Sequence, residues 1–449
     1  MVKAGAEGPT SRSARTQRRR HGSNQVGLGQ FNERVVLHAI RVHGATPKAD
    51  LARLTRLSTQ TVSLIINRLL DEGLVLKRGR VRGRIGQPSV PIALNPSGAY
   101  SIGVKIGRRS LDVLMVDFTG RICSRSTMDY AFPDPDRVFD EVGARVEHLR
   151  QSLPPDQRRR IVGVGVAAPL SLGGWQALLQ IGPDQAERWN QTDIRARVQQ
   201  ITGLPTEFAK DTAAACVAEL VAGRGQTVDG YVYLFVDTFI GGGLVIDGHL
   251  HSGIHGNAGA VASMPLGLAV AGAERPAQLL SAASLWTLEQ RFAAAGLDTT
   301  AVNDARALKA PWSDETNVWL MDAARAIALA ITASNALLDL DGAIIDGSCD
   351  RELLARLLAE VDAALGRYDG EGMTRPQLLA GSHGGDARAL GGALLPLYAR
   401  FSPDRNVFTR DDAGNVAIEE PPDSPSPKAP AAGATRKRRA APRAAQTSA

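Results

Sequence analysis

A predicted helix from Thr59 to about Leu70 carries polar side chains of the types that contact DNA bases. Its apolar residues recur at three- and four-residue spacing and predict one buried stripe: Val62, Ile65, Ile66 and Leu69. The opposite face carries short hydrogen-bonding groups and one cation, and such groups pair with base edges in the major groove. The residues expected to contact bases are Gln60, Thr61, Ser63 and Asn67. Those expected to contact phosphates are Thr59 and Arg68.

A basic segment with several glycines follows this helix, over residues 77–88. It holds five cations and three glycines within a dozen residues. This composition predicts a flexible hairpin that suits a phosphate ridge or a narrow minor groove. We expect Arg82 and Arg84 to enter the minor groove, with Gln87 close behind them.

The elements around these residues arrive in the order of a winged helix-turn-helix. A first helix, residues 30–43, carries Phe31, Val35, Val36, Ala39 and Ile40 on one face and stops at Gly44. Thr46 is expected to cap a second helix, with Pro47 at its first position. A break at residues 56–58 then leads into the polar helix, whose cap is Ser58. A small helical bundle with a solvated basic loop is the alternative, and the order of cap, turn, stripe, polar face and basic hairpin favours DNA binding.

The formal net charge of +6 is unevenly distributed along the 449 residues. Residues 1–98 carry 17 Lys and Arg against 5 Asp and Glu, and residues 421–449 carry 6 against 1. The stretch between them, residues 99–420, carries 29 against 40. The two ends should therefore attract a polyanion and the middle should repel it, which excludes the middle as a nucleic-acid surface.

Composition also restricts the cellular setting. Cys123, Cys216 and Cys349 lie far apart, so neither a disulfide framework nor a zinc knuckle is predicted. Every uninterrupted apolar run is shorter than the ~20 residues of a membrane span, and the basic N-terminus has no apolar segment behind it. We expect a cytoplasmic protein without membrane contact. Residues 1–26 are expected to form a disordered basic arm, and residues 409–449 a disordered tail rich in Pro, Ala, Lys and Arg.

Residues 98–408 alternate predicted strands with predicted helices, which is typical of an α/β domain. The elements of its first part are strands at 100–106 and 110–116, a turn at 117–120, a helix at 135–153 and a strand at 161–167. The same opening of strand, strand and turn recurs at 231–237, 241–246 and 247–248. This recurrence suggests an internal duplication. The closing elements are an alanine-rich helix at 317–338, a buried strand at 343–345 and a helix at 387–395.

These elements, with several glycine-rich segments, resemble the ROK family of repressors, open reading frames and kinases, which includes xylose and N-acetylglucosamine repressors. The segments that carry the resemblance are 82–88 (Arg-Gly-Arg-Ile-Gly-Gln-Pro), 210–219, 240–248, 253–259 and 391–393. Taken together with the winged helix-turn-helix, the resemblance covers residues from about 27 to 404. The resemblance implies a duplicated α/β fold of the actin-like, hexokinase-type ATPase class for residues 98–408, behind a winged helix-turn-helix over residues 27–97.

The resemblance also implies two phosphate-binding loops, and this sequence departs from both. The family's first loop has an Asp followed by Gly-Gly-Thr-Lys, where this chain has Lys105 and then Gly107-Arg108-Arg109-Ser110. A Lys does not hold Mg²⁺, and two Arg side chains crowd a loop that glycine leaves open. The second loop is Gly-Thr-Gly in the kinases and Asp237-Thr238-Phe239 here. We therefore expect neither ATP binding nor enzyme activity.

The sugar-binding and zinc-binding motifs of the family are incomplete as well. The family's Asn-Asp pair is Lys210-Asp211, and its Gly-Glu-x-Gly-His segment is 259–263 (Gly-Ala-Val-Ala-Ser), without the Glu and the His. Residues 270–276 lack the cysteines of the family's zinc knuckle, so we expect no metal and no cofactor. The remaining effector candidates are Asp211, His255 and Asn257. A surface ion pair is the alternative for Asp211, and a structural hydrogen bond is the alternative for His255.

Together these features predict a sequence-specific transcriptional regulator, acting as a repressor of carbohydrate-related genes. Its expected partners are a double-stranded DNA operator, a sugar or sugar derivative as effector, and a second copy of the chain, in a dimer or tetramer. Two alternatives remain: a sugar kinase with an added DNA-binding domain, and a DNA-binding dimer that responds to no effector. An intact phosphate loop would favour the first, and DNA binding unaffected by any small molecule would favour the second.

Overall fold

The computed structural model describes residues 25–79, 90–130, 132–170, 172, 183–269 and 275–403. The predicted tail lies outside the described residues, and so does the predicted arm up to residue 24. Helix α1 begins at Gln25, so the last two residues of the predicted disordered arm are helical instead. Arg82, Arg84 and Gln87 also lie outside the described residues.

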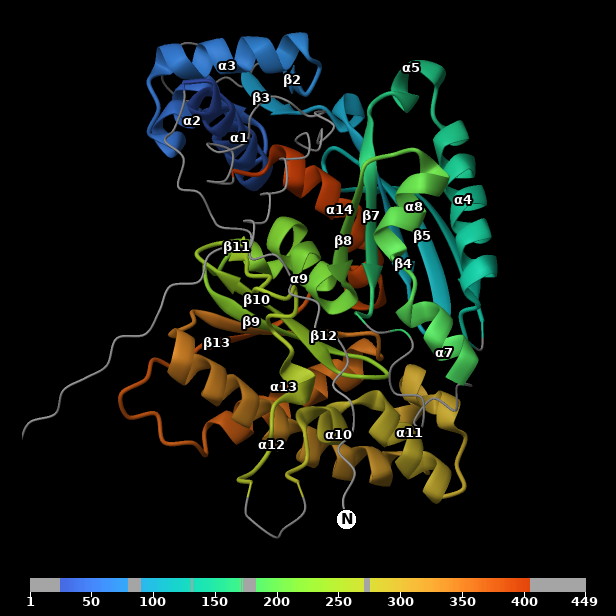
Figure 1. The fold of residues 1–449 in the computed structure, drawn as a ribbon. Helices are drawn as coiled ribbons and strands as arrows, with labels where there is room; N and C mark the ends of the chain where they lie inside the picture. The colour runs from blue at the N-terminus through green and yellow to red at the C-terminus, as the bar shows by residue number, and fades with distance from the viewer. Residues whose placement is uncertain are drawn as a thin grey trace, which may run out of the picture. The chain divides into compact units, whose positions relative to one another are not determined.

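The N-terminal unit consists of three helices and a small antiparallel sheet (Figure 1, blue). Its elements are α1 (Gln25–His43), β1 (Thr46–Pro47), α2 (Lys48–Thr55), α3 (Thr59–Asp71), β2 (Val75–Lys77) and β3 (Pro91–Leu94). The strands are ordered β1-β3-β2, with Val75 opposite Leu94 and Thr46 opposite Ile92. Gly44 after α1 has a positive φ of 71°, which ends the helix as predicted.

The prediction for the start of α2 was wrong. Thr46 does not cap the helix: its backbone pairs with β3, and its hydroxyl donates to the carbonyl of Gly44 at 3.1 Å. Pro47 is the residue before the helix rather than its first residue, with extended backbone angles and no side-chain cap. Strand pairing is favoured because it gives hydrogen-bond partners to the backbone groups of Thr46. In a capping conformation these groups would be left to bond with solvent.

The core of the N-terminal unit lies where its three helices meet. The predicted stripe of α3 (Val62, Ile65, Ile66 and Leu69) is buried. It meets Val36, Leu37 and Ile40 of α1, together with Leu51 of α2 and Ile92 of β3. Phe31 and Val35, expected on the buried face of α1, are only half-buried. The same cluster continues into Phe118 and Leu394 of the following domain, so the two parts share one apolar core.

The rest of the described chain builds two five-stranded sheets with the same connectivity. The first, in the order β6-β5-β4-β7-β8, contains β4 (Tyr100–Ile106), β5 (Ser110–Asp117), β6 (Ile122–Asp129), β7 (Ile161–Ala168) and β8 (Thr206–Lys210). The second, in the order β11-β10-β9-β12-β13, contains β9 (Tyr231–Val236), β10 (Gly241–Ile246), β11 (His249–Leu250), β12 (Gly342–Gly347) and β13 (Gln377–Ala380). Each has an antiparallel meander followed by two parallel strands. This equivalence agrees with the predicted duplication, and we call the halves lobe 1 and lobe 2.

Helices cover both sheets (Figure 1). Those of lobe 1 and its connections are α4 (Pro135–Ser152), α5 (Pro155–Arg158), α7 (Pro183–Asn190), α8 (Ile194–Thr202) and α9 (Asp211–Ala222). Those of lobe 2 are α10 (Leu279–Ala283), α11 (Leu285–Ala294), α12 (Ser313–Leu338) and α13 (Arg351–Leu365), followed by α14 (Ala387–Phe401). Short 3₁₀ turns occur at Pro96–Gly98, Arg224–Gln226, Val261–Ser263, Thr299–Asn303, Ala305–Leu308 and Gly384–Asp386.

Helices α9 and α14 join the two lobes. Helix α14 packs on strands of the first sheet, α9 packs on β10 of the second, and the two helices pack against each other. Their backbones approach so closely that a Cβ on Gly391 would lie 1.7 Å from the carbonyl oxygen of Ala214. A Cβ on Gly165 of β7 would similarly lie 1.9 Å from the carbonyl oxygen of Gly392. Glycine is therefore required here for close packing.

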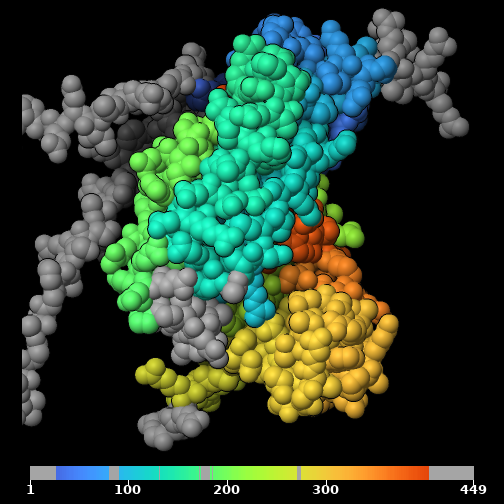
Figure 2. All heavy atoms as spheres, turned by 90° about the vertical axis from the view of Figure 1, so that its right-hand side faces the viewer, coloured from blue at the N-terminus to red at the C-terminus, as the bar shows by residue number. Residues whose placement is uncertain are grey.

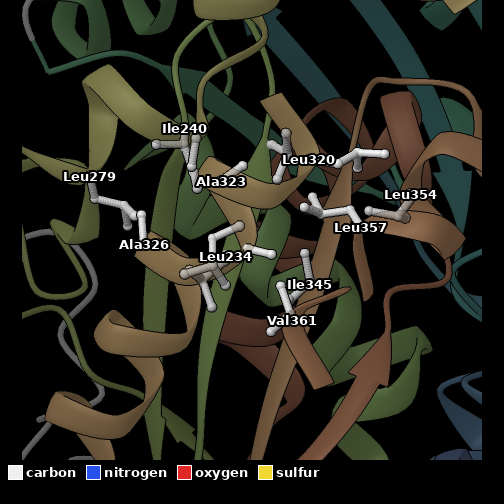
Figure 3. Close-up of a cluster of buried hydrophobic side chains, with 14 of the residues drawn as sticks. Leu234, Ile240, Leu279, Leu320, Ala323, Ala326, Ile345, Leu354, Leu357 and Val361 are labelled. Atoms are coloured by element: carbon white, nitrogen blue, oxygen red, sulfur yellow. The ribbon is translucent and has the colours of Figure 1, made fainter. Parts of the chain in front are cut away.

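The core of lobe 2 lies between its sheet and helices α12 and α13. Figure 3 shows Leu234 and Ile345 from the sheet facing Leu320 of α12 and Leu357 of α13. Within the described residues α12 is the one helix long and apolar enough to cross a membrane, and half of its most apolar window is buried. A core helix of a globular protein has the same properties, so this similarity is weak support for a membrane span.

Candidate nucleic-acid interface and inter-lobe site

Helix α3 begins with the serine cap that the sequence predicts. The Ser58 hydroxyl accepts a hydrogen bond from the backbone N–H of Thr61 at 3.1 Å. It also lies 2.8 Å from the hydroxyl of Thr61. The cap fixes where α3 starts and turns its apolar stripe toward α1 and α2. Thr61 is predicted to contact a base, and its hydroxyl also hydrogen-bonds to the capping hydroxyl of Ser58.

The solvent-facing side of α3 carries the other predicted base contacts. Thr59 and Gln60 are exposed and Ser63 is half-buried, and within the described residues their side chains have no hydrogen-bond partner. Leu64, which sequence reasoning missed, lies on the same side and is 67% exposed. An apolar side chain among free polar ones matches a groove surface, where thymine methyl groups alternate with hydrogen-bonding edges.

Two of the predicted DNA contacts are engaged inside the N-terminal unit. Asn67 accepts a hydrogen bond from the ammonium of Lys48 at 3.1 Å, and Arg68 forms an ion pair with Glu33 of α1. Burial raises the pKa of Glu33, an effect that the Arg68 charge opposes. These contacts tie α3 to its neighbours, while both side chains remain exposed, so the DNA contacts predicted for Asn67 and Arg68 stay predictions. Lys48 is a further cation beside the exposed face of α3. Its position there follows from the fold and is not evident in the sequence.

The basic segment between β2 and β3 is held at its base by the small sheet. Lys77 lies opposite Ile92, and the N–H of Arg78 donates to the carbonyl of Pro91 at 2.9 Å. Residues 80–89 lie outside the described residues. The roles predicted for Arg82, Arg84 and Gln87 therefore stay predictions.

The second candidate site is a cluster of charges between the two lobes. Lys105 takes the position where the family's first phosphate loop has an Asp, and it is buried at the end of β4. Its ammonium donates to the Ser110 hydroxyl at 2.6 Å and to Asp112 at 2.9 Å. Burial lowers the pKa of Lys105, while the pKa of Asp112 is also lowered because Lys105 outweighs the effect of burial. A cation that neutralises a carboxylate here replaces a metal-binding group.

Asp237 stands at the position of the second phosphate loop, and its carboxylate forms an ion pair. It accepts hydrogen bonds from Arg388 of α14 and from the hydroxyl of Ser348. The same guanidinium lies 3.8 Å from Asp211 and over the ring of Phe235, 5.0 Å from its centroid. Burial alone would raise the pKa of Asp237, but the Arg388 charge and the Ser348 hydrogen bond lower it. Arg388 therefore provides positive charge to both Asp237 and Asp211. Without it, these two carboxylates would need a cation from outside the protein.

Two further arginines cross from lobe 1 to lobe 2. The guanidinium of Arg108 lies over the ring of Phe239, 5.0 Å from its centroid. The neighbouring Arg109 pairs with Glu289 of α11 at 3.2 Å. Figure 2 views the side of the molecule on which lobe 1 (teal) adjoins the α11 and α12 region (yellow). The turn predicted to be too crowded for phosphate thus connects the lobes through its side chains.

The predicted effector residues are only partly brought together. Asp211 begins α9, where its carboxylate accepts from the N–H of Thr212 at 2.9 Å. The alternative for Asp211 was a surface ion pair with the neighbouring Lys210. The Lys210 ammonium instead donates to Asn257 at 3.2 Å. Burial lowers the pKa of Lys210. His255 is exposed in the loop just before Asn257.

Two buried carboxylates that sequence reasoning missed hold the loops around the cluster. Glu219 accepts from the N–H groups of Arg224 and Ser382, and Asp346 accepts from Arg351 at 2.7 Å and from the N–H of Gly384 at 2.8 Å. Both are fully buried. A carboxylate directly after a buried strand was the only signal in the sequence for Asp346. In the described part of the chain no three His, Cys, Asp or Glu side chains gather as a metal site would need.

Two matched sheets joined by α9 and α14, with charged groups at the strand ends between them, define a duplicated, actin-like α/β domain. A model of the ROK family matches residues 101–398. The chain belongs to the ROK family.

Two curated relatives have names that concern transcription. The xylose repressor of Bacillus subtilis is 23% identical over 244 residues, which cover 54% of this chain and 62% of the repressor. The chain thus matches less than two thirds of that protein's length. A transcriptional regulator of Mycobacterium tuberculosis is 26% identical over 405 residues, 86% of this chain and 89% of the regulator.

Solved structures share the fold. A ROK family transcriptional regulator described as a homologue of the Escherichia coli MLC protein superposes with a TM-score of 0.62 at 21% identity, covering 84% of this chain and 98% of the other. A ROK family glucokinase from Streptomyces griseus superposes with a TM-score of 0.52 at 22% identity, covering 66% and 99%. At these identities the likeness establishes the architecture alone.

Proposed function

We propose that the chain is a DNA-binding transcriptional repressor of carbohydrate-related genes. Residues 27–97 are its winged helix-turn-helix and residues 98–408 its regulatory domain. The observation that carries the proposal is the solvent side of α3, where Thr59 and Gln60 are exposed and unpaired opposite a fully buried stripe. Regulators among the relatives, one of them matched over most of its length, support it.

The proposed partner of this face is a double-stranded operator, read by a homodimer with two-fold symmetry. Gln60, Thr61 and Ser63 would contact bases through the major groove, and Thr59 would contact phosphate. Asn67 would contact a base and Arg68 a phosphate, and their bonds to Lys48 and Glu33 would hold both side chains on the same face. The cations of residues 77–84 supply the salt-dependent part of the affinity.

We further propose that the large domain binds an effector and transfers no phosphoryl group. Phosphoryl transfer needs a metal-holding carboxylate and an open phosphate loop. At these positions the chain has Lys105 bound to Asp112, and Asp237 bound to Arg388. The proposed effector is a sugar or sugar derivative, in contact with Asp211, His255 and Asn257. A turnover assay with ATP and a panel of hexoses tests this part, and measurable product would contradict it.

DNA binding by the purified full chain tests the main proposal. The probe is its own upstream DNA, against a scrambled duplex of the same length and composition. We expect the upstream DNA to bind at least about a thousandfold more tightly, as specific sites usually do. Equal affinity for both duplexes would contradict sequence-specific regulation.

A further inference from the structure

Three consecutive arginines form a basic turn on lobe 1, between the end of α5 and the start of β7: Arg158, Arg159 and Arg160. Residues 99–420 carry 29 Lys and Arg against 40 Asp and Glu, so this run is a local exception in an acidic stretch. Surface charges act on a polyanion only over a range of ~10 Å in moderate salt. The surroundings of the basic turn therefore determine what it can bind.

The basic turn lies against the N-terminal unit, where α3 ends. A Cβ on Gly73, in the turn after α3, would lie 3.1 Å from Nη1 of Arg160. The same nitrogen donates to the carbonyl of Ser97 at 3.1 Å, and the carbonyl of Arg160 accepts from the N–H of Tyr100 at 2.9 Å. The side chain of Asn95 donates to the carbonyl of Gly73 at 2.7 Å. These contacts fix the position of the basic turn relative to α3.

Of the three arginines, Arg159 is the one whose charge is left for an outside partner. Arg158 donates to the carbonyls of Leu153 and Gln151 at the end of α4, at 3.0 and 3.2 Å. Arg160 is half-buried at the junction with the N-terminal unit. Arg159 is exposed, and in the described part of the chain its side chain has neither a salt bridge nor a hydrogen bond.

The end of α3 is the place where a DNA backbone passes if α3 lies in the major groove. The 13 residues of α3 make a helix about 20 Å long, whereas the groove is about 12 Å wide. When the first two turns of α3 contact base edges, its last turn therefore lies beside the phosphates. Asp71 and Glu72 are exposed at this end and repel phosphate. The adjacent basic turn supplies the positive charge that lets the backbone approach.

We propose that the basic turn of lobe 1 contacts the phosphate backbone of the DNA that α3 recognises, with Arg159 as the contacting side chain. This inference rests on the proposed function for its partner, double-stranded DNA. Arg158 and Arg160 hold the turn in place, so that Arg159 is presented beside α3. Such a phosphate contact positions the protein on the duplex and carries no sequence information. Lobe 1 thereby takes part in DNA binding despite the negative net charge of residues 99–420.

Fluorescence anisotropy of the full chain tests the proposal, with the upstream DNA and the scrambled duplex at about 50 and about 200 mM salt. We expect Arg159→Gln to weaken binding of both duplexes by a similar factor, because a phosphate contact is independent of sequence. This factor should be at least about threefold smaller at the higher salt, since each lost phosphate contact lowers the salt slope by about 0.9. Arg159→Lys should bind nearly like the wild type, and Arg159→Glu more weakly than Arg159→Gln.

The matched control is Arg137→Gln, which removes the same charge from the same lobe. Arg137 is exposed, and its side chain has no partner among the described residues. It lies in the first turn of α4, about 20 Å along the helix from the end that leads to α5. Arg137→Gln should bind both duplexes like the wild type. Urea unfolding followed by tryptophan fluorescence establishes that each variant is folded.

Three results overturn the proposal: unchanged binding by Arg159→Gln at both salt concentrations, an equal loss in Arg137→Gln, or a loss restricted to the upstream DNA. The same data separate this inference from the proposed function. Preference of the wild type for upstream DNA, with Arg159→Gln unaffected, contradicts only this inference. Equal affinity of the wild type for both duplexes, reduced in parallel by Arg159→Gln, contradicts only sequence-specific regulation. Binding to neither duplex contradicts both.

Discussion

At the scale of single residues, Asp237 forms an ion pair that is visible only in the folded chain. Its partner Arg388 lies 151 residues further along, and both side chains are largely buried. Asp237→Asn keeps the shape of the side chain but leaves the guanidinium without its main counter-charge. We expect a loss of about 3 kcal/mol in the free energy of unfolding at pH 7, measured by urea titration. A change below ~1 kcal/mol would mean that Asp211 alone suffices for Arg388.

The same pair predicts a pH dependence. The pKa of Asp237 is lowered in the folded state, so its stabilising effect is complete above the unfolded value of ~3.9 and is lost as pH falls through the lower folded value. The difference in unfolding free energy between wild type and Asp237→Asn should therefore be constant from about pH 5 to pH 8. It should shrink below about pH 4. A difference that grows with acidity would contradict the assigned ion pair.

A substitution of Gln60 tests whether this single side chain contributes to DNA sequence recognition. Gln60→Ala removes an exposed amide of the kind that pairs with adenine in a major groove, so we expect specific affinity to fall by about 1–3 kcal/mol. Affinity for scrambled DNA should change little, because phosphate contacts remain. Fluorescence anisotropy on both duplexes measures the two effects, with Gln199→Ala on α8 as an exposed control. An equal loss on both duplexes would remove Gln60 from the base-contacting set.

At the scale of elements, the packing of α9 against α14 depends on glycine. A Cβ at Gly391 would clash with the backbone of Ala214, and backbone atoms have little room to move. We expect Gly391→Ala to cost about 3 kcal/mol or to prevent folding. Gly385→Ala is the matched control, since a Cβ there meets nothing within 4 Å, and it should change stability by less than about 0.5 kcal/mol. Equal stability of both variants in urea unfolding would contradict this packing.

Elements with strong periodicity were predictable from the sequence. Strands β4 and β9, helix α3 and its Ser58 cap lie within a residue or two of their predicted bounds, because local spacing determines them. Thr46 failed because a non-local strand competed with a local cap. The ion pairs of Arg68 and Arg388 were also beyond sequence reasoning, since their partners are 35 and 151 residues away.

At the scale of the whole molecule, α1 links the N-terminal unit to lobe 1. Arg41 donates to the carbonyl of Phe118 at 3.0 Å and lies over its ring at 5.3 Å. Arg34 reaches the carbonyls of Ala399 and Ser402 at the end of α14, at 3.5 Å each. Burial lowers the pKa of Arg41 to about 10, so this side chain stays charged at neutral pH. The contacts therefore join α1 both to lobe 1 and to the end of α14.

Arg41→Ala tests this link. It leaves the Phe118 carbonyl without its donor, at a cost of about 1–3 kcal/mol that falls on the junction. We expect faster proteolysis of the N-terminal unit, followed by mass spectrometry. Tryptophan-fluorescence unfolding should stay nearly unchanged, because all five tryptophans lie between residues 175 and 319. Unaltered proteolysis would show that the shared apolar core holds the junction without Arg41.

We propose that the exposed face of α3 recognises a specific DNA sequence. The measurement that tests this is the affinity of the full chain for its own upstream DNA and for a scrambled duplex, each at about 50 and about 200 mM salt. We expect preference for the upstream DNA at both salt concentrations, and a fall in both affinities with salt as phosphate contacts weaken. Equal binding to the two duplexes, or no binding to either, would contradict it.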